Sequence, residues 1–248
     1  MPPEKAGPSV WLSPTRSLPG PGGCSVAGSY LPTCPTTSCP GHVPQPVPKP
    51  SCPLADVTDP NSIKEAVGKV REEVGSAGLN LLINNASTTR RSTLTTETAE
   101  NMTLVYTTNT IGPLQTSQAF LPLLKEAAEA EGQREMSCSR AAIVNISSIL
   151  GSIEAAEAWE ERQDICYRCS KAALNMLTKC LALEYGGSGI LCVSVDPGCV
   201  TPPLGRGTVS DGPVTVEESV RGVLRLLAQL SATSNGTFWD WRGQSLPW

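Results

Sequence analysis

Tyr167 and Lys171 are the two residues of this chain whose types and spacing most directly suggest chemistry. A Tyr four residues before a Lys places both side chains on one face of a helix, one turn apart. An ammonium group close to a phenol favours the phenolate, so the phenol pKa falls and the Tyr can exchange a proton with a substrate. The plain alternative is a half-buried Tyr beside a solvated Lys. The spacing alone does not distinguish these two interpretations, so the other motifs of the chain must be considered.

Polar side chains follow apolar runs at several further points. Two amides end the apolar run over residues 81–83, and two hydroxyls end the β-branched run over residues 142–146. An Asn and a Gly lie within a long helical pattern over residues 97–131, where Pro113 and Pro122 predict kinks. In chain order the motifs are Asn84-Asn85-Ala86, Asn109-x2-Gly112, Ser147-Ser148, Tyr167-x3-Lys171 and Asp196-Pro197-Gly198.

The elements that position these motifs alternate between strand and helix. Hydrophobic periodicity predicts strands over 53–57, 79–86, 141–149, 189–195 and 237–241, and helices over 59–75, 97–131, 165–185 and 216–230. This alternation predicts an α/β fold with a doubly wound, mostly parallel sheet. Ligands in such sheets bind beyond the carboxyl ends of the strands. Asn85, Ser148 and Pro197 are predicted to lie at those ends.

The ordered motifs resemble those of the classical short-chain dehydrogenase/reductase family, which has a Rossmann-like fold. The segment Asn235-Gly236-Thr237-Phe238-Trp239-Asp240-Trp241 and the final Pro247-Trp248 resemble the C-factor (C-signal) and sniffer-type carbonyl reductase branch. The resemblance covers residues 54–248. It implies an NAD(P)-dependent oxidoreductase that transfers hydride between a nicotinamide and a small-molecule carbonyl substrate, and a homodimer.

The resemblance also implies four catalytic roles. Tyr167 protonates the developing alkoxide, Lys171 lowers the Tyr pKa and holds the nicotinamide ribose, and Ser148 hydrogen-bonds the carbonyl oxygen. Asn109 fixes a water molecule that links Lys171 to solvent. The alternative for Asn109 is a helix-interior amide that bends the helix or bonds a backbone carbonyl. Ser147 is the competing serine, and alternation along the strand places it on the face opposite to Ser148.

The same resemblance implies a set of cofactor-binding residues. Asp56 and Val57 meet the adenine, and Asn85 and Ala86 run beside the adenosine ribose. The nicotinamide end is lined by Pro197, Gly198, Val200, Thr201, Tyr167 and Lys171. Two departures from the family pattern bear on this set: Ser87 replaces the usual Gly and adds atoms beside the cofactor, and Thr201 stands one residue closer to Pro197-Gly198 than is usual.

Residues 1–53 differ in composition from the rest of the chain. They are rich in Pro, Gly, Ser and Cys and lack apolar periodicity, which predicts an irregular or disordered segment before a domain over residues 54–248. The family opens with a strand, a glycine-rich phosphate loop and a helix. Pro19-Gly20-Pro21-Gly22-Gly23 neither follows an apolar strand nor opens a helix. The first βαβ unit is therefore predicted to be missing or replaced, leaving an apolar sheet edge, and the choice between NADP and NAD stays open.

Composition excludes several other classes of function. The net charge of −4 and a pI of about 5.2 give no basic face for nucleic acid or an anionic membrane. No stretch reaches transmembrane length and no signal peptide is recognised. In the N-terminal segment Cys34-x4-Cys39 fits the spacing of metal ligands loosely and has no second pair, so no metal site is predicted. These features favour a cytoplasmic enzyme. The alternatives are a catalytically impaired family remnant that binds a protein partner, and a chain that folds poorly.

Overall fold

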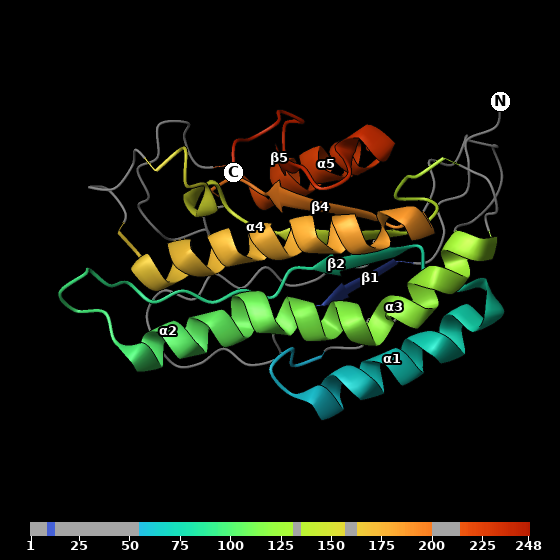
Figure 1. The fold of residues 1–248 in the computed structure, drawn as a ribbon, viewed down its shortest axis with the longest axis horizontal. Helices are drawn as coiled ribbons and strands as arrows, with labels where there is room; N and C mark the ends of the chain where they lie inside the picture. The colour runs from blue at the N-terminus through green and yellow to red at the C-terminus, as the bar shows by residue number, and fades with distance from the viewer. Residues whose placement is uncertain (1–8, 13–54, 131–134, 157–162, 200–213) are drawn as a thin grey trace, which may run out of the picture.

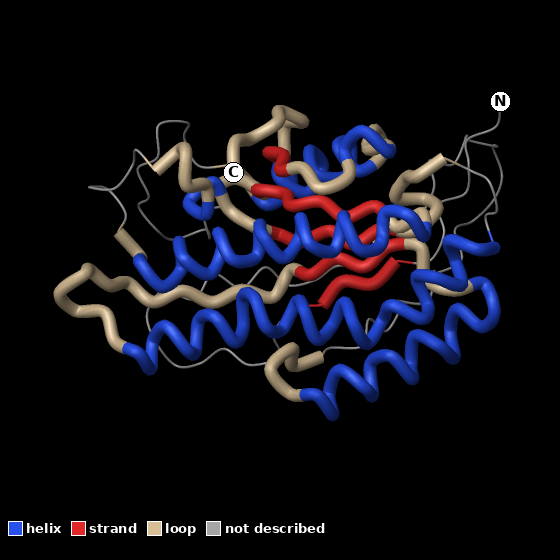
Figure 2. Tube along the Cα trace, in the orientation of Figure 1, coloured by secondary structure: helices blue, strands red, loops and turns tan. Residues whose placement is uncertain are grey.

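A five-stranded parallel sheet is the centre of the computed structural model, which describes residues 9–12, 55–130, 135–156, 163–199 and 214–248. The strands lie in the order β1-β2-β3-β4-β5, and every neighbouring pair is parallel (Figures 1 and 2). The strands are β1 Ser9–Leu12, β2 Leu81–Asn84, β3 Ala142–Ile146, β4 Leu191–Asp196 and β5 Phe238–Asp240. The predicted α/β fold with a parallel sheet is confirmed.

Helices cover both faces of this sheet. Helices α1, α3 and α4 pack along one face and α5 packs on the other (Figure 1). The α-helices are α1 Pro60–Val74, α2 Ala99–Tyr106, α3 Gly112–Ala130, α4 Ile165–Tyr185 and α5 Val216–Leu227. Short helical turns are η1 Gly75–Ala77, η2 Thr107–Ile111, η3 Ile149–Gly151, η4 Gly186–Ser188 and η5 Ala232–Ser234. Two apolar cores result, one on each face, as expected of a doubly wound sheet.

A buried polar ladder fixes the register of the three central strands. Asn84, Asn145 and Ser194 lie side by side across β2, β3 and β4. The side-chain amide of Asn84 donates to Oδ1 of the Asn145 side chain at 2.8 Å, and Asn145 Nδ2 donates to the Thr178 hydroxyl at 2.8 Å. Ser194 donates to the same hydroxyl at 2.8 Å, which ties α4 to the sheet. Because a slipped strand would leave these buried groups unpaired, the ladder holds the carboxyl ends of the strands in line.

The long helix predicted over residues 97–131 is interrupted in its middle. A π-helical segment, η2, separates α2 from α3. Pro113 has no N–H, so it cannot bond the carbonyl of Asn109 four residues earlier. The Gly112 N–H reaches back five residues to the Thr107 carbonyl instead. Kinks were predicted at Pro113 and Pro122. The π-helical segment, which contains Asn109, lies just before Pro113, and α3 continues through Pro122.

The N-terminal part departs from the sequence prediction in two places. Residues 1–53 were predicted to be irregular, yet Ser9–Leu12 forms β1 and pairs in parallel with β2, so β2 has a neighbour where an open edge was expected. A four-residue strand between prolines carries too little local pattern to be recognised, because its pairing is long-range. The short strand predicted over 53–57 is wrong for its described part. Asp56 there opens a turn, since its carboxylate accepts the Thr58 N–H at 2.9 Å. The glycine-rich stretch and the N-terminal cysteines lie outside the described residues.

Candidate active site

Helix α4 carries Tyr167 and Lys171, and its first turn is fixed from outside the helix. The residue before it, Asp164, has a left-handed backbone with φ of 36° and caps no N–H with its side chain. Glu97, which precedes α2, supplies the missing acceptor: its carboxylate takes the Cys166 N–H at 3.1 Å. Free N–H groups at a helix start favour such an anionic partner. The segment before α2 therefore sets the position of the helix that bears the predicted catalytic pair.

Lys171 is buried and reaches the carboxyl end of β3. Only 1% of its surface is exposed, and its Nζ donates to the Ile146 carbonyl at 2.7 Å. Nζ lies 5.5 Å from the centre of the half-buried Tyr167 ring. Burial lowers the pKa of Lys171 to about 7, although the negative charge of Asp196 opposes the shift. The predicted pair is thus brought together, with an ammonium that titrates near neutral pH.

Asp196 is a second buried ionisable group at this edge. It ends β4, and burial raises the pKa of its carboxyl, while hydrogen bonds from the backbone of Gly198 and Ile149 and the charge of Lys171 lower it. The Gly198 N–H donates to its Oδ1 at 3.0 Å. Asp196 therefore links the turn after β3 to the turn after β4. Asp196 belongs to the motif Asp196-Pro197-Gly198, but no role was predicted for it from the sequence.

Ser148 and Ser147 occupy different surroundings after β3. Ser148 is half-buried, and its hydroxyl accepts the Leu150 N–H at 3.2 Å, so it begins the turn η3. Ser147 is 2% exposed, and its hydroxyl has no hydrogen-bond partner among the described residues. Ser148 begins η3, and this turn packs closely against Lys171. The contact is at Gly151, where an added Cβ would stand only 2.6 Å from the Lys171 Cβ.

The side chain of Asn109 is fully buried and connects three segments. Its Oδ1 accepts the Thr88 N–H at 2.8 Å, and its Nδ2 donates to the Thr88 carbonyl at 2.9 Å and to the Ser170 hydroxyl at 2.9 Å. The Ser87 hydroxyl also meets Oδ1, at 3.3 Å. Asn109 thus bonds a backbone carbonyl, as its alternative interpretation expected, and does so beside Lys171. Its role in a water path stays a prediction.

The residues predicted to bind adenine and ribose differ in their exposure and contacts. Asp56 is half-buried and its Oδ1 accepts the Thr58 hydroxyl at 2.7 Å. Val57 is 3% exposed and packs against Gly112, where an added Cβ would stand 2.8 Å from Val57, so its side chain belongs to the core. Asn85 is half-buried and Ala86 is buried directly after β2. Their contacts with a cofactor stay predictions.

The turn after β4 requires a glycine at its centre. Gly198 has φ of +80°, and a Cβ there would stand 2.7 Å from the Trp241 indole nitrogen. The carbonyl of Pro197 accepts the Ser219 hydroxyl at 2.5 Å, which attaches this turn to α5. Val200 and Thr201, predicted to meet the carboxamide, lie outside the described residues.

Other kinds of site receive little support from the described residues. Burial raises the pKa of the Cys166 thiol, and raises that of Cys192 to about 12, which makes both poor nucleophiles. Cys166 and Cys169 are free thiols. Within the described ranges no three His, Cys, Asp or Glu side chains gather as a metal site, and no helix is long and apolar enough to cross a membrane.

The chain is similar to known proteins in sequence and in fold. A family model described as short chain dehydrogenase matches residues 50–211. The chain belongs to the short-chain dehydrogenase family. C-signal of Myxococcus xanthus is 30% identical over 148 residues, which cover 60% of this chain and 79% of that protein. The NADPH-bound carbonyl reductase from chicken fatty liver is 49% identical and superposes with a TM-score of 0.74, covering 79% of this chain and 76% of that one.

The branch predicted from the C-terminal motifs is also confirmed. The carbonyl reductase Sniffer of D. melanogaster is 34% identical with a TM-score of 0.72, covering 79% of this chain and 77% of that one. Together with the C-signal and chicken relatives, it places the chain in the C-signal and sniffer-type branch. Ser148 follows β3, Lys171 bonds the last residue of that strand, and Asn109 bonds Ser170 of α4. The catalytic roles of these residues and of Tyr167 stay predictions.

Proposed function

We propose that this chain is an NAD(P)-dependent carbonyl reductase that uses Tyr167, Lys171, Ser148 and Asn109. The family, the carbonyl reductase neighbours and the convergence of these four residues support the proposal. The cofactor supplies the hydride when bound. The chain supplies the proton and the groups that hold the carbonyl oxygen. The proposal includes a cytoplasmic location, which cell fractionation tests.

The burial of Lys171 is the observation that carries the proposal. A lysine with 1% exposure has lost most of its hydration, which is costly for a charged group. A purely structural position would favour Leu or Met, which fill the same volume without that cost. The retained ammonium faces the Tyr167 ring at 5.5 Å and bonds the Ile146 carbonyl. A buried lysine with a lowered pKa beside a phenol is typical of a site that transfers protons.

The proposed division of work follows from these positions. Tyr167 donates a proton to the carbonyl oxygen as it becomes an alkoxide, and the charge of Lys171 stabilises the phenolate left behind. Ser148 donates a second hydrogen bond to the same oxygen. Asn109 holds the segment after β2 against α4, which keeps Lys171 in place.

The described part of the cofactor site fits the nicotinamide half of NAD(P). A turn with a glycine at φ of +80° follows β4 beside the buried Lys171, and Asp196 bonds that turn. The Ser87 hydroxyl, predicted to crowd the cofactor, meets the Asn109 side chain at 3.3 Å. Residues 13–54, where a phosphate loop would be sought, lie outside the described residues.

A homodimer through the outer faces of the two helical segments that hold Asn109 and Tyr167, η2 and α4, is part of the proposal. Three apolar side chains are exposed there: Ile111 by 42%, Met176 by 64% and Leu183 by 76%. Exposed apolar side chains gathered on adjacent helices are typical of association surfaces. Light scattering of the wild type and of Met176→Glu/Leu183→Glu tests this. We expect the wild type to be a dimer and the double variant to be a monomer. A monomeric wild type would contradict the proposal.

A titration with NADPH and NADH, followed by tryptophan fluorescence or calorimetry, tests the function. We expect binding, followed by turnover of carbonyl compounds. Tyr167→Phe should abolish turnover and leave cofactor affinity nearly unchanged, whereas Lys171→Ala should damage both. Turnover retained in Tyr167→Phe contradicts the assigned mechanism. If no binding is detected at millimolar cofactor, the binding free energy is about −4 kcal/mol or weaker. That result favours the alternative of a family remnant that binds a protein partner.

A further inference from the structure

The C-terminal tail of the chain turns back along strand β5. After Gly243, which has φ of +87°, the tail runs antiparallel to the strand. Asp240 donates its N–H to the Gln244 carbonyl at 2.8 Å, and Leu246 donates to the Phe238 carbonyl at 2.8 Å. The tail is therefore attached to the edge of the sheet. Figure 1 shows that the C-terminus lies beside the arrowhead of β4.

Trp248 reaches from this tail to the segment that follows Ser148. Its backbone oxygen accepts the N–H groups of Ile153 and Glu154, each at 3.0 Å, and the Ser152 hydroxyl at 3.2 Å. Two successive backbone N–H groups and a hydroxyl thus donate to one oxygen and form a defined binding site for it. The Ser152 hydroxyl is itself fixed, because that residue is 3% exposed and also accepts the Ala155 N–H at 3.0 Å.

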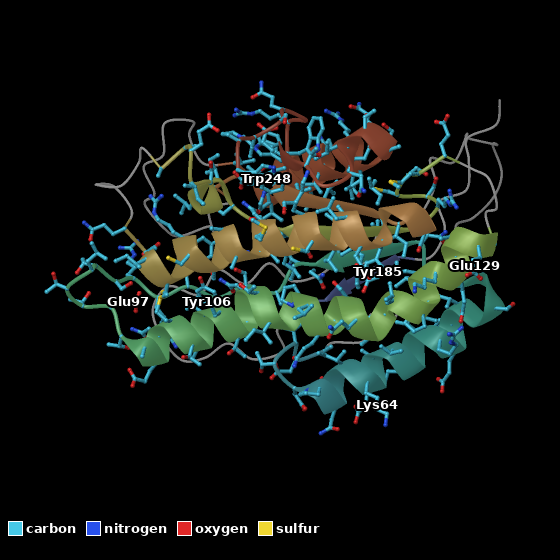
Figure 3. The ribbon with its side chains drawn as sticks, viewed as in Figure 1. Lys64, Glu97, Tyr106, Glu129, Tyr185 and Trp248 are labelled. Atoms are coloured by element: carbon cyan, nitrogen blue, oxygen red, sulfur yellow. The ribbon has the colours of Figure 1, made fainter. Side chains whose placement is uncertain are left out.

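The ring of Trp248 anchors this contact to the core. It stacks on Phe238 with ring centres 5.7 Å apart and planes 18° from parallel. Phe238 is 1% exposed and pairs with Ser194 in β4, so the ring rests on a strand that cannot shift without disturbing the sheet. Figure 3 labels Trp248 above the ribbon of α4. The indole thus holds the backbone oxygen in place for residues 152–154.

The segment from Ser148 to Glu154 is held from its other side by α4. Gly151 lies so close to Lys171 that a Cβ would stand 2.6 Å from the Lys171 Cβ and 2.7 Å from its backbone carbon. Gly151 donates its N–H to the Ser148 carbonyl at 2.8 Å. The turn is therefore confined between the catalytic helix and Trp248. Loss of either support would let Ser148 move relative to Lys171.

We propose that Trp248 is a positioning residue that clamps the turn after β3, and so fixes Ser148 for the carbonyl oxygen. This inference rests on the proposed carbonyl reductase activity. Trp248 needs no contact with the substrate, since it acts through residues 152–154. A misplacement of a polarising hydroxyl by about 1 Å is enough to reduce catalysis substantially.

Three variants test the clamp. Trp248→Ala removes the stacked ring, Trp248→Phe keeps an aromatic ring on Phe238, and Val216→Ala truncates a side chain of similar exposure, 43% against 38%, at the start of α5. We expect amide exchange of residues 152–154 to rise about 10-fold or more in Trp248→Ala. We expect kcat/KM for a carbonyl substrate to fall about 10-fold or more in the same variant, with NADPH affinity unchanged. Trp248→Phe should restore both quantities, and Val216→Ala should change neither.

The outcomes separate the clamp from the proposed function. Unchanged exchange in Trp248→Ala overturns the clamp. Raised exchange with unchanged kcat/KM overturns its role in positioning Ser148. Wild-type protein that binds no NADPH and reduces no carbonyl overturns the proposed function and the catalytic part of the inference with it, while exchange still decides whether Trp248 holds the turn.

Discussion

The buried ammonium of Lys171 predicts a specific dependence of stability on pH. Its pKa is lowered from 10.5 to about 7 by burial. Between these two pH values the unfolded chain binds one more proton than the folded chain, so the free energy of unfolding rises with pH. Below pH 7 the lysine is charged in both states, and the folded state then bears the full free-energy cost of the buried charge. The shift corresponds to about 5 kcal/mol at most, at about 1.4 kcal/mol per pH unit.

Lys171→Met removes this charge and keeps most of the volume. We expect the variant to be more stable than the wild type at pH 6. Its advantage should shrink by roughly 2–3 kcal/mol between pH 7 and pH 9, as the wild type loses its buried proton. Urea unfolding at a series of pH values measures both curves. Lys179→Met, which removes an exposed lysine from the same helix, is the control and should leave the slope unchanged. An advantage that stays constant over this range would refute the reasoning.

Two further predictions concern paired positions. Ser148→Ala should lower kcat for carbonyl reduction by roughly 100-fold, whereas Ser147→Ala, which removes a buried hydroxyl without a partner among the described residues, should leave kcat and stability nearly unchanged. The reverse result in steady-state kinetics would reassign the serine. Gly78→Ala should destabilise the fold by about 1–3 kcal/mol, because φ there is +73° and a Cβ would stand 2.4 Å from the backbone of α3. Gly68→Ala, in α1 with open space around it, should stabilise by about 0.5–1 kcal/mol in the same unfolding assay, and a loss there would contradict the helix-propensity argument.

Local patterns in the sequence determined most of the fold after residue 55. Helix α4 spans Ile165–Tyr185, as its apolar stripe predicted, because an amphipathic helix records its own period. The missing N–H of Pro113 accounts for the π-helical segment before it, but the sequence alone did not distinguish Pro113 from Pro122, through which α3 continues. Strand β1 and the turn at Asp56 were not predicted correctly. The first depends on pairing with a distant strand, and the second on a side chain that bonds its own backbone in place of a ladder.

The types and order of the site residues were evident from the sequence, while their environment was decided only by the tertiary structure. The spacing of Tyr167 and Lys171 fixed a shared helix face. It could not show that Lys171 is buried against the Ile146 carbonyl, because every residue type has a backbone carbonyl and the sequence does not indicate which one accepts the bond. Asp196 and Trp248 acquire their roles from segments far away in the chain. Burial and convergence are properties of several elements packed together, so the sequence names the candidate groups and the fold sets their pKa values and positions.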